Sequence, residues 1–76
     1  MTAEKFSTME LAALRNELVD QGLDARQAGE VLVMFLMGRG YGVSTEAAVD
    51  AATRVEGAGC SLAAIQRELE GLAMVQ

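Results

Sequence analysis

The stretch of sequence that decides the fold is Val31-Leu32-Val33-Met34-Phe35-Leu36-Met37, the longest apolar run in the chain. Just before this run, Asp24 and Gln27 have the spacing of a capping box, which marks the start of a helix. The capped start predicts a helix over residues 25–37. An apolar run of this length also fits a buried strand. A lone strand, however, has nothing to pair with except a strand from another copy of the chain.

A helix that is apolar on every side has to be enclosed by other elements, or it leaves one side for a partner. The chain has 76 residues, of which 51% are hydrophobic, and so small a domain cannot surround one of its own helices completely. We therefore expect the helix over 25–37 to be central and name Met34, Phe35 and Met37 as candidate partner-binding residues. Methionine-rich surfaces adapt to their partners. The alternative is that these three side chains belong to an ordinary core.

Helix start and stop signals divide the rest of the chain, which contains no proline. The predicted helices cover residues 8–21, 25–37, 45–56 and 62–74. Leucines spaced by three and four residues give the first and last of them an apolar stripe. The helix over 45–56 has a stripe of small residues instead, which lets a neighbouring helix come close. The sequence thus predicts a single all-α domain over residues 1–76, a compact bundle or orthogonal array of about four short helices.

The charge and hydropathy of the chain restrict its partners and its location. Eleven acidic residues and six basic residues give a net charge of −5, and such a charge opposes binding to the phosphate backbone of nucleic acids. No signal-peptide pattern is present, and no apolar run approaches the roughly 20 residues that span a bilayer. We expect a cytoplasmic protein with no membrane partner. The abundance of alanine, and of arginine over lysine, is typical of a bacterial or phage protein.

The sequence lacks the groups that most active sites and metal sites use. There is no histidine, so the thiol of Cys60 has no imidazole to activate it. Glu46 and Asp50 share a helical face, but two carboxylates without a further ligand make a poor metal site. We expect no catalytic residue, no metal ligand, no cofactor and no small-molecule substrate, and therefore no enzymatic function.

The connector Gly38-Arg39-Gly40-Tyr41-Gly42 contains the other two candidate residues. Phosphate-binding loops follow a strand and open a helix, whereas these glycines follow a helix and have no lysine beside them. A flexible turn is the better interpretation. Arg39 and Tyr41 are candidates for partner binding, because Arg and Tyr are enriched at interface hot spots. The alternative is a solvated arginine and a tyrosine that lies over the edge of the core.

The segment 44–72 has the order helix, glycine-containing turn, helix, and in this it resembles a helix-turn-helix. The resemblance implies that the second helix reads the major groove of DNA. Here that helix offers Arg67 beside Glu68 and Glu70. The chain is also loosely similar to three-helix adaptor domains of the ubiquitin-associated type, with Gly40 and Tyr41 in place of their glycine–aromatic loop.

These observations favour a small acidic protein–protein interaction module, which acts as a regulator, adaptor or inhibitor of a larger protein. Its expected partner-binding residues are Met34, Phe35, Met37, Arg39 and Tyr41. One alternative is a DNA-binding regulator of the helix-turn-helix type that acts as a dimer. Another is a structural subunit of a homo-oligomer, whose partner is a second copy of the chain.

Overall fold

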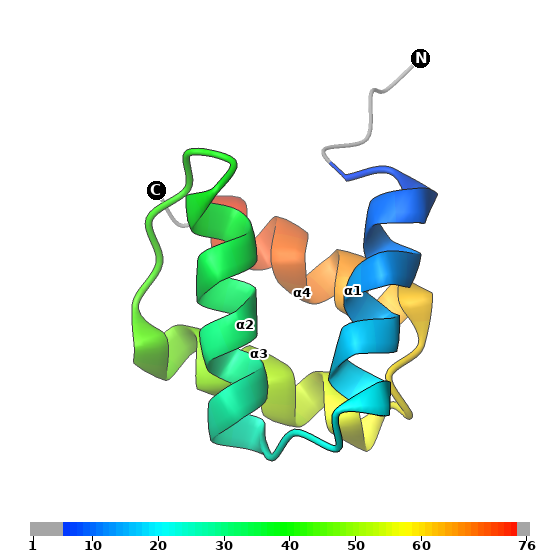
Figure 1. Cartoon of the computed structure of the whole chain (residues 1–76). Coiled ribbons are helices and arrows are strands. Elements are labelled where there is room, and N and C mark those ends of the chain that lie inside the picture. The colour runs from blue at the N-terminus through cyan, green and yellow to red at the C-terminus, as the bar shows by residue number, and fades with distance from the viewer. Residues whose placement is uncertain (1–5, 75–76) are drawn as a thin grey trace.

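The structure, a computed structural model, describes residues 6–74 and contains four α-helices in this range. They are α1 (Thr8–Asp20), α2 (Ala25–Met37), α3 (Thr45–Gly57) and α4 (Leu62–Met74) (Figure 1). No strand occurs among the described residues, so the predicted all-α fold is confirmed. Each helix begins and ends within one residue of the range expected from the sequence.

Capping side chains define where the helices begin. The Ser7 hydroxyl accepts the Glu10 N–H at 3.1 Å, and the Glu10 carboxylate accepts the Ser7 N–H at 3.0 Å. Asp24 and Gln27 form the same reciprocal pair at α2, and a serine hydroxyl caps each of α3 and α4. Caps of this kind stabilise a helix by about 1 kcal/mol each. After α1, Gly22 adopts a φ of 59°, the left-handed conformation that turns the chain towards α2.

The helices form an orthogonal array rather than a parallel bundle. In Figure 1, α1 and α2 run in opposite directions and are joined by a short turn, while α3 and α4 cross behind them. α2 packs most extensively on α3, and α4 contacts all three other helices. The main support of α1 is α4 rather than α2, so the two helices at the front of Figure 1 are held apart.

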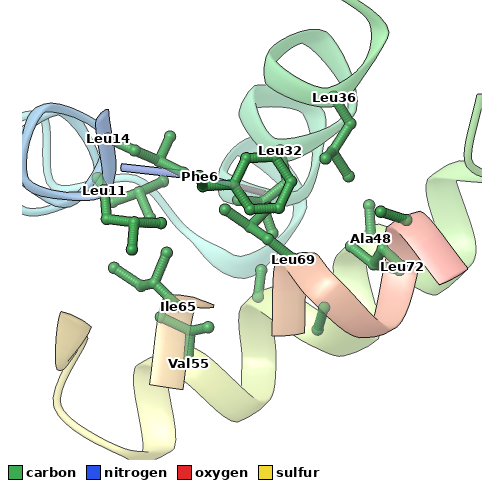
Figure 2. Packing of buried hydrophobic residues seen from close by; sticks show 14 residues of the cluster. Phe6, Leu11, Leu14, Leu32, Leu36, Ala48, Val55, Ile65, Leu69 and Leu72 are labelled. Carbon is green, nitrogen blue, oxygen red and sulfur yellow. The ribbon is translucent and has the colours of Figure 1, made fainter. Parts of the chain in front are cut away.

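Leucines from three helices meet in the core, together with one aromatic ring from the chain before α1. The largest fully buried side chains are those of Phe6, Leu32, Leu36, Val55, Ile65 and Leu69. Figure 2 shows the ring of Phe6 among the leucines of α1, α2 and α4. The predicted stripe of α1, formed by Leu11, Leu14 and Leu18, is buried as well. Because Phe6 belongs to this core, the segment before α1 is part of the packing.

α2 and α3 approach closely where Gly29 of α2 meets Val49 of α3. A Cβ atom built on Gly29 would lie 2.7 Å from Cγ2 of Val49 and 2.9 Å from its Cα and backbone N. Real side chains do not approach so closely, and the neighbouring atoms include backbone that cannot move aside easily. The surface of α3 beside this contact is lined by the buried Ala48 and Ala52, as expected for a helix with a small-residue stripe.

α2 takes part in the largest helix–helix contact, as its expected central place implies, but only one side of it is covered. Its buried positions are Gly29, Leu32 and Leu36. On the opposite side, the exposed fractions of Met34 and Met37 are 72% and 60%. Four helices of this length do not supply enough surface to cover both sides of α2.

One acidic side chain is buried among the described residues. Glu68 of α4 is 9% exposed, and its carboxylate accepts a hydrogen bond from Nε of Arg54 in α3 at 2.9 Å. Nε of Arg67 lies 3.9 Å from the second carboxylate oxygen. The pairing compensates for removing the charge from water and ties α3 to α4.

The contact at Gly29 leads to a prediction on stability. Gly29→Ala should lower the free energy of unfolding by about 1–3 kcal/mol, because the added methyl group forces α2 away from α3. Gly71→Ala is a matched control, since Gly71 also lies in a helix but has no neighbouring atom within 4 Å of its Cβ position. The control should stabilise the chain by about 0.5–1 kcal/mol through helix propensity. Equal effects of both substitutions in urea unfolding would show that α2 and α3 are not in close contact.

Candidate functional site

Apolar side chains occupy the side of α2 that faces away from α3. We call this surface the outer face of α2, and it consists of Glu30, Val31, Val33, Met34 and Met37. Both valines are half-buried, whereas both methionines are largely exposed. Glu30 is exposed and lies one turn of the helix before Met34, at the N-terminal end of this face. The outer face is thus a flexible apolar surface with one carboxylate at its N-terminal end.

The third candidate residue of α2, Phe35, belongs to an aromatic cluster at the C-terminal end of the helix. Its ring centroid lies 5.6 Å from that of Phe6. The ring of Tyr41, the fourth candidate, lies 6.3 Å from that of Phe6 in an edge-on arrangement. Phe35 and Tyr41 are both half-buried. Both rings pack against the buried ring of Phe6, so they have contacts within the chain.

Arg39, the fifth candidate, connects the end of α2 to the start of α1. Its guanidinium carbon lies 3.9 Å from the centroid of the Phe35 ring, a cation–π contact. One guanidinium nitrogen donates to the Phe35 carbonyl at 3.3 Å, and another donates to the Glu10 carboxylate. The Arg39 side chain is 33% exposed. It therefore holds the connector between α2 and α3 against α1 and still presents part of its surface.

The Glu10 carboxylate has two tasks, because it completes the cap of α1 and also pairs with Arg39. The hydrogen bond from Arg39 lowers the pKa of Glu10 below its usual value of 4.5, and the hydrogen bond from the Ser7 backbone N–H lowers it further. Both donors stabilise the charged form of the carboxylate. This pair joins the two ends of the chain segment that contains α1 and α2.

An open groove runs between α1 and α2. Leu14 and Glu17 of α1 line it on one side, and Val31, Met34 and Phe35 of α2 line it on the other. Its volume is about 250 Å³. In Figure 1 a short turn joins α1 to α2, so the two helices that line the groove are consecutive in the sequence. The groove is apolar except for the Glu17 carboxylate on its α1 side.

The structure thus divides the predicted site residues into two groups. Met34 and Phe35 line the groove, and Met37 lies beyond it on the outer face of α2. Arg39 and Tyr41 belong to the aromatic cluster at the end of the groove. Sequence reasoning missed the contribution of α1, because helical spacing shows which residues share a face and does not show which helix stands opposite. The three-residue spacing of Leu14 and Glu17 does indicate that these two side chains are neighbours on the surface of α1.

Comparisons with known proteins add no functional information. A scan against protein-family models, a search of curated proteins and a search of solved structures found no match to this chain.

A second apolar pocket, of about 210 Å³, lies between the turn after α1 and the C-terminal end of α3. Leu18, Leu23, Ala28, Val55 and Cys60 contribute to its lining. Cys60 has a φ of 55°, which is uncommon for a residue with a side chain, and its N–H donates to the Val55 carbonyl at 2.9 Å. The chain has no histidine that could activate this thiol.

The described residues contain neither a metal-ligand cluster nor an isolated buried polar group. No group of three or more Cys, Asp or Glu side chains is placed to hold a metal ion within this part of the chain. Every buried side-chain nitrogen or oxygen in the same range has a hydrogen-bond partner. None of the described helices has the length and apolar character needed to cross a bilayer. The groove and the outer face of α2 are therefore the strongest candidate site.

The Glu10–Arg39 pair predicts how stability depends on pH. Because the pKa of Glu10 is lowered in the folded chain, its contribution is complete above the unfolded pKa near 4.5 and is lost as the pH falls through the lowered folded value. Glu10→Gln should remove the part of the pH dependence of stability that comes from this carboxylate. Arg39→Ala should reduce that part, because the hydrogen bond from Arg39 is the main cause of the lowered pKa of Glu10. Urea unfolding of the parent and both variants between neutral and acid pH measures the difference. Parallel stability curves for the parent and Glu10→Gln would contradict the pairing.

Proposed function

We propose that this chain is a small acidic interaction module that binds another protein through the groove and the outer face of α2. The observation that carries this proposal is the exposure of Met34 and Met37, at 72% and 60%, beside an apolar groove. The core is complete without these side chains, since Leu32 and Leu36 fill the covered side of α2. Burying them against a partner would add roughly 1.5–3 kcal/mol of hydrophobic stabilisation for each side chain.

The side chains that make up this surface are suited to binding a partner protein. Methionine side chains are unbranched and polarisable, so they adjust to the shape of an apolar partner. The aromatic cluster beside them is fixed by packing around Phe6 and by Arg39. A flexible apolar surface next to a rigid aromatic end resembles the anchors and supporting contacts of protein interfaces. Such a module regulates or recruits a larger protein by occupying one of its surfaces.

The helix-turn-helix alternative receives less support from the geometry. α4 would be the recognition helix, and Arg67 is its only basic residue. The guanidinium of Arg67 lies next to the buried Glu68 carboxylate, which α4 also uses to bind Arg54. The Arg67 side chain is 71% exposed, but it is a single cation on a helix that also carries Glu68 and Glu70, whose charges are repelled by phosphates.

A site-specific photocrosslinker tests this proposal without knowledge of the partner. Benzoylphenylalanine replaces Met34 or Met37 in one set of cells and Ala63, an exposed residue of α4, in a control set. We expect a discrete product of higher mass from positions 34 and 37 and none from position 63. Equal products from all three positions, or none from positions 34 and 37, would refute the proposal. A product with twice the mass of the chain would support the homo-oligomer alternative instead.

A double substitution separates binding from folding. Met34→Ser with Met37→Ser should change the free energy of unfolding by no more than about 0.5 kcal/mol for each site, because both side chains are exposed. The same variant should lose the crosslinked product from a benzoylphenylalanine placed at Val33, on the same face. A large loss of stability would mean that the methionines serve the fold.

A further inference from the structure

We infer that the groove between α1 and α2 accepts an amphipathic helix of a partner protein, with apolar anchor residues and a row of Lys or Arg along the flank that faces α1. This inference rests on the proposed function and specifies the partner that the same surface recognises. It follows from the size of the groove, from the position of one carboxylate and from the charges that the chain has already paired.

The size of the groove fits the side chains of a helix better than a small molecule. Its volume of about 250 Å³ is below the range of about 300–1,000 Å³ that small-molecule sites occupy. It is also open along the sides of α1 and α2, with Leu14, Phe35 and Val31 in its lining. A helix laid into such a groove inserts residues at spacings of three and four, and its remaining side chains lie against the two walls.

The two walls of the groove differ in charge. On the α2 side the lining is Val31, Met34 and Phe35, all apolar, whereas the α1 side contributes the Glu17 carboxylate. Asp20 lies three residues after Glu17, outside the groove lining and about 60° further around α1; the two neighbouring carboxylates form the acidic edge of α1. Arg15 directly follows Leu14, and a step of one residue turns it by about 100° around the helix, away from this edge.

The acidic edge has no basic partner within the described part of the chain. The ion pairs in residues 6–73 involve the carboxylates of Glu10 and Glu68 and none from Glu17 or Asp20. Glu10, at the other end of α1, is already neutralised by Arg39. A bound helix with Lys or Arg on the matching flank would supply the missing charges. Its attraction to a chain with a net charge of −5 would also speed association.

A second copy of the chain is a poor occupant of the same groove. Its own exposed apolar helix surface is the outer face of α2, which carries Glu30 one turn before Met34. Pairing two such faces would bury two carboxylates and bring together two chains that each carry a net charge of −5. A partner with basic flanks avoids both costs.

A displayed library of helical peptides tests this inference on the full chain. All peptides share a fixed leucine stripe, while the flanking positions vary among Lys, Glu, Ser and Ala. Peptides selected for binding to the unsubstituted chain should be enriched in Lys along one flank. When such a peptide binds, the NMR signals that shift should be those of Leu14, Glu17, Val31 and Met34. Glu17→Lys should weaken the binding of the selected Lys-flanked peptides about fivefold, as measured by fluorescence anisotropy. Peptides selected for binding to this variant should carry Glu along that flank instead. Glu56→Lys, the same charge change on an exposed residue of α3, should leave both results unchanged.

Three results would overturn the inference. One is the enrichment of no peptide that maps to the groove, and another is a flank composition that does not respond to Glu17→Lys. The third is a dimer in light scattering whose interface covers Met34. If the peptides fail while crosslinks from positions 34 and 37 persist, the partner has another chemistry and the proposed function stands. If those crosslinks are also absent, the proposed function fails as well.

Discussion

The close contact between Gly29 and Val49 sets the arrangement on which the other features depend. A glycine at this position allows α2 and α3 to approach so closely that the space a Cβ atom would need is taken up by Val49. That approach buries Leu32 and Leu36 on the same side of α2 as Gly29. Once this side is used for α3, Met34 and Met37 on the opposite side of the helix face outward. The exposure of Met34 and Met37 is thus a consequence of how α2 is packed.

A second constraint acts at the other end of α2, where Phe6 and Arg39 determine the shape of the groove. α1 rests on α4 rather than on α2, and Phe6 is packed in the core between the leucines of these helices (Figure 2). The rings of Phe35 and Tyr41 pack against Phe6, and Arg39 fixes the connector to the cap of α1 through Glu10. These contacts keep α1 close to α2 without letting the two helices close on each other. The groove is therefore built into the fold.

Much of the fold was predictable from local signals, because caps, glycines and apolar spacing act within a few residues. Ser7 with Glu10 and Asp24 with Gln27 form the capping boxes expected from their spacing. The stripe Leu11, Leu14 and Leu18 is buried as its periodicity indicated. The aromatic cluster of Phe6 with Phe35 and Tyr41 could not be predicted in this way, because its members are distant in the sequence.

The candidate site was less predictable, because it depends on which helices become neighbours. The apolar run indicated Met34 and Met37, and the structure leaves both exposed. Arg39 was considered either solvated or partner-binding, whereas its pairing with Glu10 spans two segments that are distant in the sequence. The role of Glu17 beside Val31 and Met34 likewise arises only when α1 and α2 are placed together. No periodicity within one helix contains that information.

The most direct test of this account is the solvent exposure of the methionine methyl groups, measured by NMR with a soluble paramagnetic compound. Met9 of α1 is an internal reference, since it is 84% exposed. If α2 packs by one side only, the methyl signals of Met34 and Met37 should broaden about as strongly as that of Met9. If both signals stay sharp while that of Met9 broadens, the outer face of α2 is covered in the free chain and the account is wrong.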